Sequence, residues 1–199
     1  MKSKAFSWVV LLFALVSASP AFAALITYTA TLDGPSESPV NASPGTGSAS
    51  VDIDTVLNTM RVQASFSGLL GNTTASHIHA PTAVAGTGTA GIATTTPTFT
   101  GFPLGVTAGS YDHLFDLTLV SSYNPSFITA HGGTVASAEI DLLAYLADGK
   151  AYLNIHTNVF PGGEIRGFLT STSVPEPSTM LLLGSGIIVL IGSRKKFNK

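Results

Sequence analysis

Three short segments of this chain each place an isoleucine between two polar residues: His77-Ile78-His79, Asn154-Ile155-His156 and Glu164-Ile165-Arg166. Successive side chains on a β-strand point to opposite faces, so the isoleucine of each segment points to one face and its polar neighbours to the other. If the isoleucines lie in a core, the polar side chains lie on an outward or cleft-facing surface. A turn at residues 161–163 separates the last two segments, which indicates that they pair as neighbouring strands.

The histidines of these segments could bind a metal ion. Neutral imidazoles two residues apart on a strand can both face one ion, as in zinc and copper sites. The expected ligands are His77, His79 and His156, with Glu164 as a candidate fourth ligand. Three nitrogens with one oxygen or water suit zinc or copper better than calcium, which prefers six or more oxygens. The alternative is structural: the histidines hydrogen-bond to the backbone or to neighbouring strands, and Glu164 pairs with Arg166.

Motifs of other chemistries are missing from the sequence. There is no G-x-S-x-G nucleophile elbow, no phosphate-binding or dinucleotide glycine motif, and no cysteine for thiolate chemistry or disulfides. His113 alternates with Phe115 and Leu117, which favours a packed histidine, and His131 precedes two glycines, which favours a loop. The sequence therefore predicts a protein that is not an enzyme.

The elements that position these residues show a two-residue period, which is typical of strands with one buried face. Strands are expected at residues 26–32, 49–54, 60–66, 77–79, 114–120, 151–156 and 164–170. Residues 35–47 and the Gly/Thr-rich region 82–109 are expected to be loops, the latter with one edge strand. A three-to-four-residue period over 137–150 predicts one short helix that ends at Gly149. The expected fold is all-β, an antiparallel β-sandwich with one short helical insert.

The N-terminus has the pattern of a signal peptide. Lys2 and Lys4 precede an apolar run at residues 8–16, and small residues end the segment at Ala21 and Ala23. Residues 1–23 are therefore expected to be removed by signal peptidase between Ala23 and Ala24. An uncleaved N-terminal membrane anchor is the alternative.

The C-terminus has three parts in order: Pro175-Glu176-Pro177, an apolar run at 180–191, and the basic cluster Arg194-Lys195-Lys196. This tail, residues 174–199, resembles the PEP-CTERM sorting signal of Gram-negative bacteria. The resemblance implies transient insertion in the inner membrane, processing by an exosortase-type enzyme, and delivery to the cell surface or outside the cell. A plain C-terminal membrane anchor fits the same residues.

The middle of the chain, residues 24–173, carries a second resemblance. HIHAP at 77–81 and AYLNIHTNVFPGGEIRGFL at 151–169 are similar to the CHRD domain, although many members of that family have glycine at the position of Ala80. The resemblance implies a secreted, β-rich domain and supplies no catalytic residues.

The middle region is acidic, since ten Asp and Glu residues stand against Arg61, Lys150 and Arg166, a net charge of about −7. This charge excludes a nucleic-acid-binding surface. The expected function is an exported cell-surface or extracellular-matrix domain with a binding or structural role, whose partners are exopolysaccharide or other surface proteins. The alternative is a small secreted zinc or copper protein with redox activity. Its H-x-H strand resembles that of copper/zinc superoxide dismutases.

Overall fold

The computed structural model describes residues 25–172. The expected cleavage site at Ala23 and Ala24 and the sorting tail from residue 174 onward lie outside the described residues. Within residues 25–172, no helix is long and apolar enough to cross a membrane.

Eight strands form a single antiparallel sheet in the order β4-β6-β7-β1-β2-β3-β5, with the short β8 paired to β1. The strands are β1 Leu25–Asp33, β2 Thr46–Asp54, β3 Thr59–Ser67, β4 Thr73–His79, β5 Gly109–Asp116, β6 Tyr152–Thr157, β7 Ile165–Phe168 and β8 Thr170–Ser171. The helices are the 3-10 turn η1 Val120–Ser122, α1 Pro125–Ala130 and α2 Val135–Ala147.

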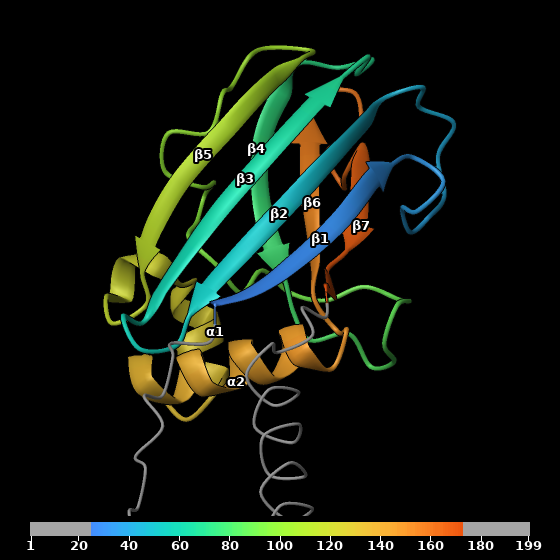
Figure 1. Ribbon diagram of the computed structural model, residues 1–199. Coiled ribbons are helices and arrows are strands. Elements are labelled where there is room, and N and C mark those ends of the chain that lie inside the picture. Colours follow the sequence, from blue (N-terminus) through green and yellow to red (C-terminus); the bar gives the residue numbers. More distant parts are fainter. Residues whose placement is uncertain (1–24, 173–199) are drawn as a thin grey trace, which may run out of the picture.

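The sheet curls so that strands β1, β2, β3 and β5 form one layer and β4, β6 and β7 lie behind it (Figure 1). The core lies between the layers, where Val51 and Val62 of the first layer and Leu153 and Ile155 of the second are fully buried. The expected all-β antiparallel fold is confirmed. The two layers are not separate sheets, however, because β7 pairs with β1 through Arg166 and Asp33 and joins them at one edge.

The expected helix at 137–150 is present as α2, where Thr134 and Ser137 form a reciprocal capping box. The expectation of a single helix was wrong, since α1 and η1 precede α2. The start of α1 did have a local signal: the Asn124 side chain accepts a hydrogen bond from Ser126 N, and Pro125 takes the first helical position.

The strand expected at 114–120 lies earlier, at Gly109–Asp116. It ends there because the Asp116 carboxylate accepts hydrogen bonds from the backbone N–H and the hydroxyl of Thr118 and turns the chain. The alternating residues Tyr111 and Phe115 are both buried in the core.

The Gly/Thr-rich region has isolated bridges, such as His79 with Ile92, in place of the expected edge strand. It runs along β4, where Phe99 N donates to Ser76 O and the Thr94 hydroxyl accepts from Ile78 N. The polar face of β4, β6 and β7, expected to be outward or cleft-facing, is consequently buried: His77 is only 3% exposed.

A candidate metal centre of three histidines

Neighbouring strands β4 and β6 bring His77, His79 and His156 together. In their antiparallel register Ala75 pairs with His156 and His77 with Asn154, so strand alternation places all three imidazoles on the same face. One ring nitrogen from each histidine lies within 4.8 Å of the other two. Alternation predicted the shared face of His77 and His79, and the pairing of β4 with β6 adds His156 to them.

Each of the three rings is held by a hydrogen bond to a backbone carbonyl. The pairs are His77 Nε2 with Pro97 O at 2.5 Å, His79 Nδ1 with Ala90 O at 3.0 Å, and His156 Nδ1 with Pro161 O at 3.0 Å. A carbonyl only accepts hydrogen bonds, so these nitrogens carry the ring proton. The unprotonated nitrogens are therefore His77 Nδ1, His79 Nε2 and His156 Nε2, the tautomers that a metal site with backbone support uses.

None of the three free nitrogens has a hydrogen-bond donor as its partner among the described residues. His79 Nε2 and His156 Nε2 are 3.4 Å apart, and with both ring protons on Nδ1 neither can donate to the other. His77 Nδ1 is buried and has no hydrogen-bond partner among residues 25–172. Buried polar atoms in native proteins are nearly always paired, so these three nitrogens are candidate ligands for a cation.

The rings are electrically neutral near pH 7. Burial lowers the pKa of His77 and of His79 to about 4, although the carbonyl hydrogen bonds oppose this effect, and burial also lowers the pKa of His156. Neutral imidazole is the form that binds metal ions, so no proton has to be displaced at neutral pH.

A stack of planar groups fixes His79. Its ring lies parallel to that of Tyr152 with centroids 4.9 Å apart, and the Arg166 guanidinium lies 4.6 Å from the Tyr152 ring centroid. The Tyr152 hydroxyl also accepts a hydrogen bond from Ala90 N. The carbonyl of the same Ala90 accepts the hydrogen bond from His79. His156 is the most exposed of the three histidines, so an ion would enter from its side.

Glu164 is not part of this cluster, and its expected role as fourth ligand is corrected. Its fully buried carboxylate accepts four hydrogen bonds, including one from the Thr157 hydroxyl at 2.6 Å. Strand alternation places Thr157 on the face of β6 opposite to His156, so the carboxylate is turned away from the imidazoles. Nor does Glu164 pair with Arg166, whose carboxylate partner is Glu37 at 3.7 Å.

Sequence reasoning missed two contributors to the site. Tyr152 could have been found, because it alternates with Asn154 and His156 on the same strand. Glu37 could not, because it lies in a Pro/Ser-rich loop with no period and reaches Arg166 only through the tertiary fold.

The two remaining histidines lie elsewhere. His113 on β5 is half-buried and packs edge-on against Phe115 at 4.6 Å between centroids. His131 follows α1 as its C-cap rather than lying in a free loop, and its Nδ1 is 2.9 Å from the Asp141 carboxylate.

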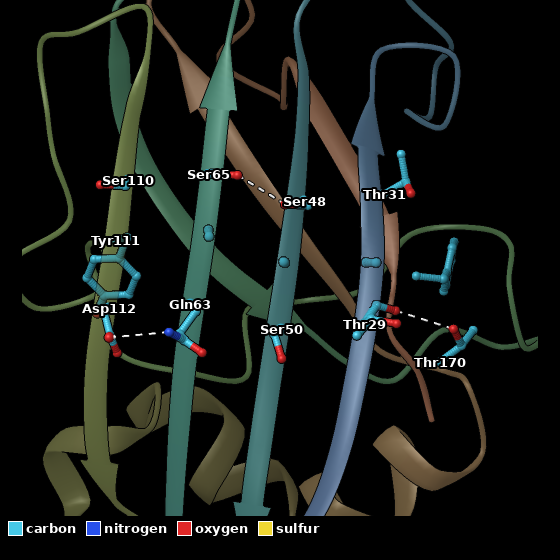
Figure 2. A pocket seen from close by; sticks show the side chains of 14 residues that line it. Thr29, Thr31, Ser48, Ser50, Gln63, Ser65, Ser110, Tyr111, Asp112 and Thr170 are labelled. Atoms are coloured by element: carbon cyan, nitrogen blue, oxygen red, sulfur yellow. Dashed lines mark hydrogen bonds between the residues drawn. The ribbon is translucent and has the colours of Figure 1, made fainter. Parts of the chain in front are cut away.

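A groove on the outer face of β1, β2, β3 and β5 lies apart from the histidines (Figure 2). Its polar lining consists mainly of Ser and Thr hydroxyls, and Ser48 and Ser65 share a hydrogen bond across it. Asp112 in this groove forms a salt bridge with Arg61, with 2.6 Å between Asp112 Oδ2 and Arg61 Nη2. The groove thus offers hydrogen-bonding groups but no cluster of groups suited to chemistry or metal binding.

Comparison with known families agrees with the two resemblances in the sequence. The CHRD domain matches residues 28–169, and the PEP-CTERM protein-sorting motif matches residues 173–196. No curated protein and no solved structure shows significant similarity to the chain.

Proposed function

Because the chain belongs to the CHRD domain family and ends in a PEP-CTERM sorting motif, we propose that it is an exported surface domain that binds zinc or copper. The proposed ligands are His77, His79 and His156. The ion supports a binding or structural role of the domain and not catalysis. The sorting motif itself indicates export and handling by an exosortase-type enzyme. Transient anchoring by the tail, and contacts with exopolysaccharide or other surface proteins, belong to the same proposal.

The metal assignment is supported by the clustering of the three histidines and by the short distance between the unprotonated Nε2 atoms of His79 and His156. Zinc–nitrogen bonds are about 2.0–2.1 Å long, so two ligands of a tetrahedral ion are separated by roughly 3.3 Å. The Nε2 atoms of His79 and His156 are 3.4 Å apart. These two rings thus have the spacing of two ligands of one ion, and one nitrogen of His77 lies within 4.8 Å of both ligand atoms.

The surroundings suit a retained ion. Backbone carbonyls hold all three rings, and such supporting contacts orient the lone pairs and raise metal affinity. His156 is partly exposed whereas His77 and His79 are buried, so water or an outside ligand can complete the coordination from its side.

The test is calorimetric titration of the purified mature chain with zinc and with copper, together with metal analysis of the protein as isolated. We expect one ion per chain, and an affinity about 100-fold lower in His77→Ala and in His156→Ala. His113→Ala is the matched control, because that histidine lies on β5 outside the cluster, and it should bind like the parent.

Absence of binding in the parent chain would refute the metal assignment, as would binding that neither substitution weakens. Circular dichroism of each variant establishes that a loss of binding does not reflect loss of the fold. A zinc-dependent rise in the melting temperature of the parent, reversed by a chelator and absent from both cluster variants, gives an independent readout.

A further inference from the structure

Exposed apolar side chains gather at one end of the domain, which we call the apolar end. Of the twelve large apolar residues that are well exposed within residues 25–172, six lie here, and each is more than half exposed. They are Leu25, Val56, Leu57, Leu119, Val120 and Ile140.

The strand register brings the segments that carry five of these residues to the same end of the sheet. Leu25 at the start of β1 pairs with Asp54 at the end of β2, Asp54 pairs with Thr59, and Thr59 pairs with Asp116 at the end of β5. Adjacent strands are about 4.8 Å apart, so the β2–β3 turn and the segment after β5 lie side by side. Helix α2, which carries Ile140, lies at the same end of the sheet (Figure 1).

Hydrogen bonds fix the two turns that carry the apolar side chains. Asp54 Oδ1 accepts from the backbone N–H groups of Val56 and Leu57, both at 2.9 Å. The neighbouring turn is closed by Asp116, and Leu117 N donates to Asn58 O at 2.8 Å to join the two turns. The side chains are thus presented on a rigid surface and not on free loops.

The chain leaves the domain at this same end. The backbone N–H of Thr172, the last described residue, donates to Thr27 O near the start of β1 at 2.9 Å. The match to the sorting motif begins at residue 173, and its apolar run begins at residue 180. Seven intervening residues span at most about 25 Å, so a tail inserted in a membrane holds the apolar end close to the lipid.

We propose that the apolar end docks on the lipid surface while the sorting tail is inserted, with Leu57 and Val120 in the interfacial layer. This inference rests on the membrane insertion included in the proposed function. The carboxylates of Asp54 and Asp116 at the ends of the neighbouring strands, and of Glu139 and Asp141 beside Ile140, disfavour an anionic surface. The fitting partner is therefore a zwitterionic bilayer, such as one of phosphatidylethanolamine and phosphatidylcholine.

The absence of cysteine from the chain makes a direct test simple. Leu57→Cys, Val120→Cys and the control Val40→Cys are each labelled with an environment-sensitive dye, and the full chain is reconstituted into zwitterionic vesicles. Val40 is exposed in the loop between β1 and β2, at the opposite end of the domain. We expect a blue shift, and quenching by lipid-attached quenchers, at positions 57 and 120 but not at position 40.

Flotation of the vesicles separates this inference from the proposed function. If the chain floats but the dyes at 57 and 120 remain as hydrated as the dye at 40, the tail is inserted and lipid docking is refuted. If the chain does not float, insertion is refuted and the docking inference falls with it. Replacing part of the lipid by phosphatidylglycerol should weaken the blue shift, and a stronger shift would overturn the assignment to a zwitterionic surface.

Discussion

The carboxylate of Glu164, directly before β7, accepts a hydrogen bond from the backbone N–H of Leu70, 94 residues earlier in the chain. It also accepts from Gly71 N and from the hydroxyls of Ser43 and Thr157. One buried side chain thereby joins the loop before β2, the turn between β3 and β4, and the β6–β7 hairpin. Burial raises the pKa of Glu164, but the four hydrogen bonds outweigh it and hold the pKa below its usual value.

Glu164→Gln should lower the free energy of unfolding at pH 7 by about 3 kcal/mol, measured by urea denaturation. The amide removes the charge and places a donor against groups that themselves donate. Because the pKa of Glu164 is lowered in the folded state, the parent has this stabilisation above pH 4.5. It loses the stabilisation as the pH falls through the pKa of the folded state, whereas the stability of the variant lacks this pH dependence. Metal affinity should stay at the parent value; a large loss of affinity would restore Glu164 as a ligand.

Glu37 should show the opposite pH dependence. Burial raises its pKa to about 7 despite the nearby Arg166. Its Oε1 and the Oδ1 of Asn154 are buried without partners in the described structure, and both lie within 2.6 Å of the position that a Cβ on Gly163 would take. Burial disfavours the charged carboxylate, so protonation of Glu37 is favoured in the folded protein.

Since the folded-state pKa of Glu37 is raised, its contribution is fully present below pH 4.5 and is lost as the pH rises through about 7. Glu37→Gln stays neutral, so its stability relative to the parent should increase between pH 5 and pH 8 by on the order of 2 kcal/mol. Urea denaturation at a series of pH values measures the difference. A difference that does not change with pH would show that Glu37 is ionised in the folded protein.

The junction between the two layers depends on Gly167. A Cβ at this position would lie 2.1 Å from the carbonyl oxygen of Thr31 on β1, far inside van der Waals contact. Gly167→Ala should therefore separate β7 from β1 and cost about 3 kcal/mol or more, seen as a fall in melting temperature. Gly162→Ala is the matched control, because no atom lies within 4 Å of its added Cβ. Equal melting temperatures for the two variants would contradict this packing.

Processing at both ends can be read from intact masses. Protein recovered from the cell surface or medium should begin at Ala24 and lack the residues beyond about Pro177, because the sequence predicts a signal peptide before the domain and a sorting motif follows it. N-terminal sequencing and mass spectrometry measure both ends. Recovery of full-length chains embedded in membrane would favour a permanent anchor instead.

The sequence by itself determined the features that depend on local period. Alternation predicted the strands around Val51, Val62 and Ile155, and it placed His77 and His79 on one face, because the side-chain direction on a strand depends only on position parity. A three-to-four-residue period of apolar residues likewise predicted α2. These features need no knowledge of which segments become neighbours.

Only the tertiary structure decided what covers and contacts those faces. The loop carbonyls of Ala90 and Pro97 that orient the histidines come from a Gly/Thr-rich region without any period, and such a region leaves no signal of where it packs. Glu164 and Arg166 do not pair with each other; each contacts a segment about 100 residues away. Such contacts depend on the curl of the sheet. A single strand carries no information about that curl, so the buried Glu37–Arg166 pair and the Glu164 network follow from the fold alone.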